Sequence, residues 1–328
     1  MCCDGTNNEI EEDNTNIVRL FRCIPHGYLD DNLEQRTYYD PGVGTFSAWR
    51  LSPTGWLGKV LGSAFGWGVQ KNINDAYRYL MNTYEEGDYV YLFGFSRGAF
   101  TVRALSGMLE KCGLPTTGSE NLIPYAARLY NETNNEETAA FFKKHFALSC
   151  TPHMIGVFDT VSSLGLLYSR LRFFNQKLTS GVRYGYHAIS IDEKRPQFPV
   201  SLWDEEQAEA DQTIEQVWFA GVHSDVGGGY ARKGLSDIAL EWMLDKAEHA
   251  GLVLNRSDFQ FHSNPHEDLH TSLTLKWQLL ARLAGHSWDG GNPRSIPSGA
   301  CIHDSVRKRM EAISDYHPAL PDNYQYVK

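Results

Sequence analysis

The sequence has few cysteines, no long apolar run and no excess of positive charge, and each shortage excludes a class of protein. Its six cysteines are spread over 328 residues without a CxxC spacing, so we expect reduced thiols and no disulfide framework. The uncharged stretch at residues 60–70 contains three glycines and is far shorter than the roughly 18 residues of a membrane span. With 40 acidic and 30 scattered basic side chains the formal charge is -10, which argues against a nucleic-acid partner.

The start of the chain, MCCDGTNNEI, has neither a basic segment nor an apolar stretch of signal-peptide length. We therefore expect a cytoplasmic protein, with export by a signal-independent machine left open. No Pro/Ser-rich linker, block of charge or repeat interrupts the composition. Because 42% of the residues are hydrophobic, a large core can form, and we expect residues 1–328 to fold as a single catalytic domain.

Short apolar runs alternate along the chain with segments of helical periodicity. Residues 89–95, 154–158 and 217–222 predict buried strands, and residues 1–3 resemble the end of a fourth. Helices are predicted over residues 73–84, over 97–112 up to Gly113, and from an N-cap at Ser236 to about Gly251. Alternating strands and helices predict a mostly parallel sheet with helices on both faces, whose chemistry lies beyond the carboxyl ends of the strands.

A serine between glycines follows the strand predicted over residues 89–95. Ser96 lies in GFSRG at residues 94–98, placed between strand and helix, which is the context of a nucleophile elbow. Gly94 and Gly98 allow a sharp turn that exposes Oγ, and the Arg97 backbone N–H becomes a candidate oxyanion donor. A small-residue turn that merely packs a helix on a strand is the alternative interpretation.

A serine hydroxyl needs a neighbouring base, and the base needs an acid to orient it. We predict His223 as the base because it follows the run at residues 217–222, and Asp159 as the acid because it follows residues 154–158. His187 and His303 remain alternative bases, and Asp192 remains an alternative acid. The order serine, acid, histidine is that of α/β-hydrolases, so we expect an α/β-hydrolase-like three-layer sandwich with long insertions.

A second oxyanion donor is expected from a loop after another strand. Asp4-Gly5-Thr6 can present N–H groups without a bulky side chain, so Gly5 or Thr6 is predicted to supply it. Asp4 either orients this loop through its own backbone bonds or forms an ordinary structural turn.

Two other motifs carry little weight. GGGY at residues 227–230 lacks both GK[ST] and a full GxGxxG, so we interpret it as backbone passing close to His223 and not as a phosphate cradle. His262, His266 and His270 have helical spacing, but Pro265 and polar neighbours indicate a loop. We expect neither a metal nor an organic cofactor.

Two apolar segments lie near the predicted chemistry. Residues 164–178, LGLLYSRLRFFNQKL, either line an acyl pocket, rest on a lipid surface or form a helix packed on the domain. Residues 49–67, rich in Gly, Leu and Trp, form either a flap over the site or ordinary packing.

The assembled motifs resemble a family of uncharacterised α/β hydrolases that includes type VI secretion phospholipase effectors of the first class. The stretches that carry the resemblance are CDGTNN (3–8), TNIVRL (15–20), YYDPGVGT (38–45), GFSRGAFTVRAL (94–105), GVFDTVSSLG (156–165), HAISIDEKR (187–195) and VWFAGVHSDVGGGY (217–230). The resemblance implies nucleophile, acid and base at Ser96, Asp159 and His223, the residues already selected from the strand ends.

The sequence therefore predicts a serine hydrolase of carboxylic esters of lipid or acyl type, similar to phospholipases. Its expected partner is a small-molecule or lipid ester, with peripheral membrane contact left open and no nucleic acid. A thioesterase or carbohydrate esterase with the same triad is one alternative, because a fold does not fix a substrate. A non-catalytic interaction module is the other.

Overall fold

The computed structural model describes residues 1–5, 13–42, 57–161, 176–196, 198–257, 259–273 and 294–328. Its centre is one eight-stranded sheet in the order β12-β11-β10-β9-β8-β5-β1-β4. The strands of this sheet are β1 (Cys2–Cys3), β4 (Tyr39–Asp40), β5 (Tyr91–Phe95), β8 (Met154–Phe158), β9 (Tyr184–Ser190), β10 (Thr213–Phe219), β11 (Ala300–His303) and β12 (Tyr324–Val327). All neighbouring pairs in it are parallel. The predicted α/β fold with a mostly parallel sheet is confirmed.

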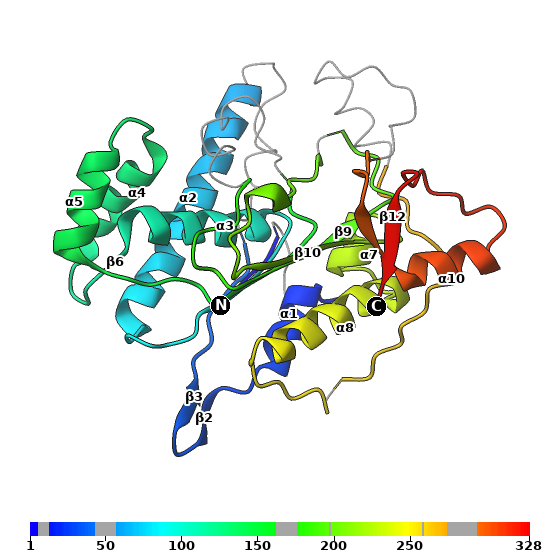
Figure 1. Cartoon of the computed structure of the whole chain (residues 1–328), viewed down its shortest axis with the longest axis horizontal. Coiled ribbons are helices and arrows are strands. Elements are labelled where there is room, and N and C mark those ends of the chain that lie inside the picture. Colours follow the sequence, from blue (N-terminus) through cyan, green and yellow to red (C-terminus); the bar gives the residue numbers. More distant parts are fainter. Residues whose placement is uncertain (6–12, 43–56, 162–175, 197, 258, 274–293) are drawn as a thin grey trace.

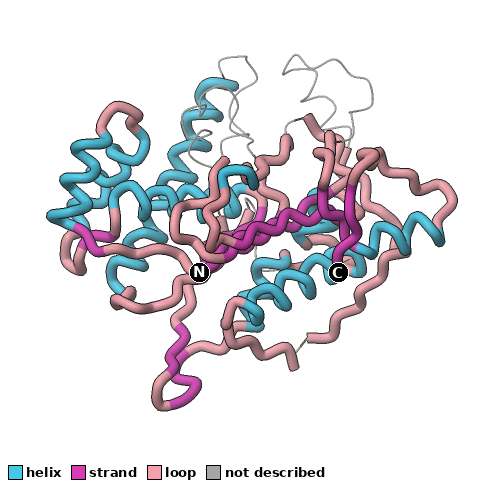
Figure 2. Tube along the Cα trace, in the orientation of Figure 1, coloured by secondary structure: helices cyan, strands magenta, loops and turns pink. Residues whose placement is uncertain are grey.

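Helices cover both faces of the sheet, which gives three layers (Figure 1). One face carries α2 (Leu57–Thr83), α3 (Arg97–Cys112), α4 (Ile123–Asn131) and α5 (Glu136–Phe146), and the other carries α1 (Asn16–Cys23) and α8 (Gly234–His249). Figure 2 shows the strands as a central band between these two groups of helices.

The two faces are built by alternation along each strand, because successive side chains of a strand point to opposite sides. In β8, Ile155 and Val157 belong to the core under α2 and α3, whereas Met154 and Phe158 belong to the core under α1 and α8. All five residues of β8 are buried, as expected for a strand covered on both faces.

The remaining elements lie around this sandwich. They are the hairpin of β2 (Gly27–Asp30) and β3 (Leu33–Gln35), the small pair of β6 (Leu114–Pro115) and β7 (Ala147–Leu148), the short helix α7 (His223–Gly227), and α10 (Asp304–Ala312), which packs on β11 and β12. Two 3-10 turns, η2 (Glu120–Leu122) and η4 (Glu205–Gln207), complete the described part.

Several predicted boundaries are confirmed and others are wrong. The helix from Arg97 ends at Cys112, and Gly113 takes the predicted left-handed position with φ 69°. The strand predicted over residues 217–222 is β10, which ends at Phe219. His223 therefore does not directly follow a strand but is the first residue of α7. Strand β10 is also separated from β8 by β9, and the N-cap of α8 is Lys233 and not Ser236.

Candidate active site

The register of the sheet aligns the ends of three adjacent strands. Cys3 of β1 pairs with Gly94 of β5, and Phe95 of β5 pairs with Phe158 of β8. One residue further along, the Ser96 N–H donates to the carbonyl of Phe158 at 3.0 Å. Ser96 and Asp159 therefore follow adjacent strands at the same edge of the sheet.

Ser96 occupies a strained turn between β5 and α3. Its φ is 57° and its ψ is -115°, and it is one of two non-glycine residues with positive φ in the described part of the chain. Such a conformation costs an L-residue about 1–3 kcal/mol and is most often retained at functional sites. The other such residue is Asp159, with φ 41°.

The two glycines around Ser96 are required by close packing. A Cβ on Gly98 would lie 2.0 Å from the carbonyl oxygen of Cys3, and a Cβ on Gly94 would lie 2.5 Å from the carbonyl oxygen of Gly98. Both contacts are impossible, so α3 can begin directly against the end of β1 only because these positions lack side chains. The GxSxG spacing is therefore matched by the geometry expected of an elbow.

His223 contacts Asp159 through its imidazole. Nδ1 lies 2.5 Å from Oδ2 of Asp159, and both side chains are almost entirely buried. Nε2 is also buried, and it has no hydrogen-bond partner among the described residues. The ring lies between two aromatic side chains, with centroids 4.6 Å from Phe95 and 5.0 Å from Phe198.

Asp159 is bound by more groups than a histidine alone. Ser190 donates its backbone N–H to Oδ1 at 2.9 Å and its hydroxyl to Oδ2 at 3.1 Å. Arg294 adds a two-pronged ion pair, with Nη1 to Oδ1 at 2.5 Å and Nη2 to Oδ2 at 3.0 Å. Arg294 is not predictable from the sequence, because nothing local to that residue marks it as part of a site.

Burial and charge act in opposite directions on this pair. Burial raises the pKa of Asp159, but the charge of Arg294 and the bond to His223 outweigh it, so the pKa lies well below its usual range. Burial lowers the pKa of His223, and Asp159 only partly opposes this. At neutral pH we therefore expect an ionised Asp159 beside a neutral imidazole, which is the state of a general base.

Two further acidic residues fix the backbone around His223. Glu193 accepts the His223 N–H at 3.2 Å, and its carboxylate is paired with Arg195 at 2.8 Å. Asp225 accepts the Val222 N–H at 3.0 Å. These contacts fix the backbone at Val222 and His223, where α7 begins and presents the imidazole.

The predicted oxyanion donors have different outcomes. Arg97 is the first residue of α3, so its backbone N–H lies at the N-terminus of that helix, directly after Ser96. The Gly5 N–H instead donates to Oδ1 of Asp4 at 2.7 Å, so it is engaged within its own loop. Thr6 lies outside the described residues.

Asp4 is hydrogen-bonded to its own loop and to two neighbouring elements, which fits both predicted alternatives. In addition to the Gly5 N–H, it accepts the hydroxyls of Thr15 at 2.5 Å and Tyr39 at 3.1 Å. Thr15 is the N-cap of α1 and accepts the Val18 N–H at 3.3 Å. The loop after β1 is thereby tied to both α1 and β4.

The alternative bases are engaged elsewhere. His187 is buried, and its Nε2 accepts the Thr160 N–H at 3.1 Å; burial lowers its pKa to about 3. His303 caps α10 by accepting the Ser305 N–H at 3.2 Å, and burial lowers its pKa to about 4. Both imidazoles have structural roles in the described part of the chain.

The alternative acid also has other partners. Asp192 accepts the Gly221 N–H at 2.7 Å and the Tyr316 hydroxyl at 2.9 Å. These bonds connect the turn after β10 to the segment after α10. Asp159, and not Asp192, is the carboxylate bonded to the His223 imidazole.

The glycine run and the three spaced histidines also have structural explanations. A Cβ on Gly227 would lie 2.0 Å from the ring of Phe95, which itself contacts His223, so the run does pass close to the base. His270 lies in a loop as predicted, where its Nδ1 is 2.5 Å from Oδ1 of Asp225.

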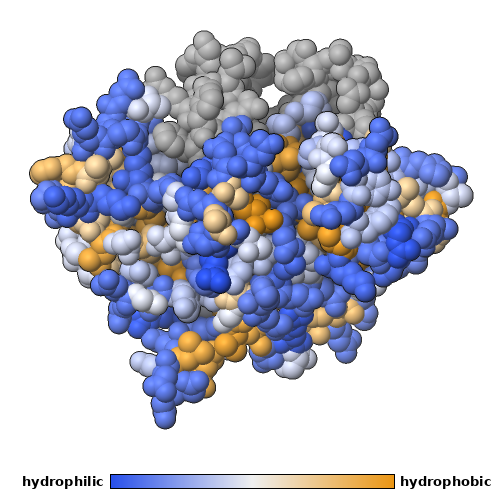
Figure 3. Space-filling view, viewed as in Figure 1, coloured by the Kyte–Doolittle hydropathy of each residue, from blue (hydrophilic) through white to orange (hydrophobic). Residues whose placement is uncertain are grey.

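The proposed lipid-facing segments are largely outside the described part. Residues 43–56 and 162–175 are not described, and Leu178, at the end of the second segment, is buried in the core. The face in Figure 3 is largely hydrophilic with scattered apolar areas. Among the described residues, no helix combines the length and the apolarity that a membrane span requires.

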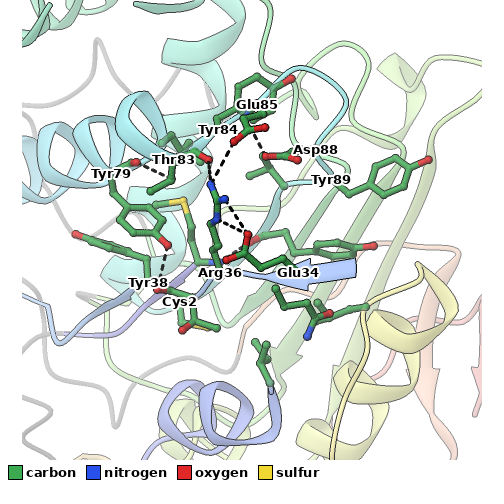
Figure 4. Close-up of a pocket in the computed structure, with 18 of the residues that line it drawn as sticks. Cys2, Glu34, Arg36, Tyr38, Tyr79, Thr83, Tyr84, Glu85, Asp88 and Tyr89 are labelled. Atoms are coloured by element: carbon green, nitrogen blue, oxygen red, sulfur yellow. Dashed lines mark hydrogen bonds and ion pairs between the residues drawn. The ribbon is translucent and has the colours of Figure 1, made fainter. Parts of the chain in front are cut away.

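A cavity of about 400 Å³ lies at the opposite edge of the sheet (Figure 4). Its lining includes Met1, Tyr91 and Arg36, and Arg36 bonds to Glu34 at 2.8 Å and to the Thr83 carbonyl at 2.8 Å. Because Met1 precedes β1 and Tyr91 begins β5, this cavity is at the amino ends of the strands. It is remote from Ser96, and we do not assign the chemistry to it.

Comparison with known proteins finds similarity to a curated protein and to solved structures, over part of their lengths. An uncharacterized protein of Saccharomyces cerevisiae is 36% identical over an alignment of 217 residues that covers 60% of this chain and 31% of the yeast protein. A crystal structure of an uncharacterized protein from Pseudomonas aeruginosa covers 77% of this chain at 19% identity with a TM-score of 0.43. The chain corresponds to less than a third of the yeast protein and to 46% of the bacterial one.

The family match is more extensive. Residues 1–246 match the family described as "T6SS, Phospholipase effector Tle1-like, catalytic domain". This region contains Ser96, Asp159 and His223, whereas Arg294 lies beyond it. Since the match covers most of the chain, the protein belongs to the family of Tle1-like phospholipase effector catalytic domains, which supports a hydrolase of the lipase or phospholipase type.

Proposed function

We propose that the protein is a serine hydrolase that cleaves carboxylic esters of lipids, in the manner of a phospholipase, through Ser96, His223 and Asp159. The single observation that carries the proposal is the buried 2.5 Å contact between His223 Nδ1 and the Asp159 carboxylate. Asp159 follows β8, and the strained turn at Ser96 follows the adjacent strand, β5. Membership of the phospholipase effector family supports the lipid as substrate.

The steps follow from which atoms are engaged. Asp159 holds the Nδ1–H of His223, so Nε2 carries the lone pair that accepts the Ser96 proton as Oγ attacks the ester carbonyl. The oxyanion is stabilised by the Arg97 N–H and the positive end of α3. Collapse of the tetrahedral intermediate expels the alcohol, which takes the proton from Nε2 and leaves an acyl group on Ser96.

Water then completes the cycle by the same chemistry. His223 Nε2 takes a proton from water, the resulting hydroxide attacks the acyl-serine, and Oγ leaves with that proton. The products are a carboxylic acid and an alcohol, and the enzyme returns to its starting state. Neither step requires a metal ion or an organic cofactor.

The test combines covalent labelling with turnover. Wild type, Ser96→Ala and His223→Ala are treated with a fluorophosphonate probe and assayed on p-nitrophenyl esters of increasing chain length and on a phospholipid. We expect labelling of wild type alone, with a preference for long chains or phospholipid. A folded wild type that neither labels nor hydrolyses would overturn the proposal and favour an interaction module.

A further inference from the structure

Asp159 carries more positive charge around it than a triad acid requires. The side chain is fully buried, and a buried carboxylate beside a neutral imidazole would have an uncompensated charge. Arg294 supplies the compensation, with 7% of its side chain exposed and both Nη atoms bonded to the carboxylate. The ion pair therefore neutralises the resting site before any proton moves.

Arg294 is itself fixed by its surroundings. Nη1 also donates to the Ser190 carbonyl at 3.0 Å and to the Ser190 hydroxyl at 2.9 Å, and Nη2 donates to the Phe198 carbonyl at 2.9 Å. Ser190 in turn donates to Asp159. The guanidinium, the serine and the carboxylate form one network in which each planar group is held at several points.

We propose that Arg294 is a positioning residue, which fixes the orientation of the Asp159 carboxylate and limits how strongly that carboxylate stabilises a protonated His223. This inference rests on the proposed function and assigns a role to a residue outside the family match. The two parallel N–H bonds of an arginine fix the plane of its carboxylate partner, and its positive charge compensates the negative one. A lysine supplies only the positive charge.

The charged groups around His223 allow the effect to be isolated. Asp159 contacts its imidazole, Glu193 accepts its backbone N–H, Arg195 is paired with Glu193, and Arg294 reaches it through Asp159. Only the last of these is changed in an Arg294 variant. When the positive charge of Arg294 is lost, nothing on this side opposes the negative charge of Asp159, so the protonated form of His223 is favoured.

Two readouts follow, one of which needs no turnover. Arg294→Met should raise the pKa of His223, measured by NMR titration of its ring protons, by about one unit. In catalysis the acid limb of kcat/KM should move to higher pH, and kcat should fall about 100-fold at pH 8 with KM little changed. Arg294→Lys should keep the wild-type pKa of His223 while losing turnover, because it retains the charge but not the fork.

The matched control is Arg309→Met. Arg309 is also a buried arginine of the C-terminal region, but its Nη1 donates to the carbonyls of Pro265 and Glu267 at 2.7 and 2.6 Å. Its loss should lower stability without moving the His223 titration. Should Arg294→Met fail to fold, Arg294→Gln supplies the same comparison, since it also removes the positive charge beside Asp159.

The outcomes separate the two proposals. Equal His223 titrations in wild type and Arg294→Met would overturn the positioning role even if the enzyme is a lipase. An altered titration in a protein without hydrolase activity would support the Arg294 network and remove the proposed function instead. Wild-type kcat in a folded Arg294→Lys would also overturn the inference.

Discussion

Replacing Asp159 with asparagine changes one atom and should remove most of the activity. The carboxylate accepts five hydrogen bonds, two from Arg294, two from Ser190 and one from His223. An asparagine has one accepting oxygen and a donating NH2 group, so a donor must face either the His223 Nδ1–H or an Arg294 N–H. If His223 shifts its proton to Nε2 in response, it can no longer accept one from Ser96.

The magnitudes follow from these two losses. A wrong histidine tautomer lowers turnover by about 10⁴-fold, which corresponds to about 5 kcal/mol in the activation free energy. Arg294 would keep its charge in a buried site without its carboxylate, which lowers the free energy of unfolding by about 3–5 kcal/mol. For a chain of this size the Tm should fall by about 6–10 °C.

The assay measures p-nitrophenyl ester and phospholipid hydrolysis beside calorimetric unfolding. Asp192→Asn is the control, because Asp192 is another largely buried aspartate at this edge of the sheet but bonds to Gly221 and Tyr316. It should retain activity within about threefold, as expected for a substitution outside the site. Asp159→Asn within tenfold of wild type would refute the assignment of Asp159 as the acid, and an inactive Asp192→Asn would shift that role to Asp192.

Three further predictions test other parts of the site. Ser96→Gly should abolish turnover. In urea titrations its free energy of unfolding should exceed that of Ser96→Ala by about 1 kcal/mol, because glycine adopts the φ of 57° without backbone strain. Equal free energies of unfolding in the two variants would contradict the strain at this position. Gly98→Ala should cost about 1–3 kcal/mol and most of the activity, because its Cβ would meet the Cys3 carbonyl at 2.0 Å. The Cβ of Gly107→Ala, in the same helix, would lie 3.0 Å from the Tyr130 hydroxyl and 3.1 Å from its ring, side-chain atoms that can shift, so stability should change by less than about 1 kcal/mol. The pKa of Asp159 is lower in the folded protein than in the unfolded chain, so its contribution to the free energy of unfolding is present above the unfolded pKa of about 3.9 and is lost as the pH falls below that value. In urea unfolding, the free energy of unfolding of Asp159→Asn should therefore fall less between pH 7 and pH 3 than that of wild type. Equal decreases in the two proteins would contradict this prediction.

The elements that carry Ser96 and Asp159 were predictable because their signals are local. The strand over Met154–Phe158 is a continuous apolar run, and the helix over Arg97–Cys112 has both an apolar periodicity and a terminal glycine. A sharp strand-to-helix turn with glycines on both sides of a serine has few other interpretations. Within the described ranges, the two non-glycine residues with positive φ are the residues that these signals selected.

The strand β9 was missed because buried polar groups interrupt its pattern. Its sequence, YGYHAIS, contains His187 and Ser190, which a periodicity analysis counts as exposed. In the structure both are fully buried, because His187 accepts the Thr160 N–H and Ser190 binds Asp159. The first half of β10 is polar and partly exposed, with only Gln216 buried, so the apolar pattern began late and the predicted start was delayed.

Arg294 could not be predicted from the sequence for a different reason: its contacts join parts of the chain that are far apart in the sequence. The three acidic residues around the His223 turn, Asp159, Glu193 and Asp225, lie within the family match. Each contacts a residue that lies after the matched region: Asp159 contacts Arg294, Glu193 contacts Ser272, and Asp225 contacts His270. Contacts between residues 45–135 positions apart leave no local pattern, because only the folded chain brings them together. The matched region therefore supplies the groups proposed to react, and the segment that follows adds Arg294 as the counter-charge of Asp159 and further bonds to Glu193 and Asp225.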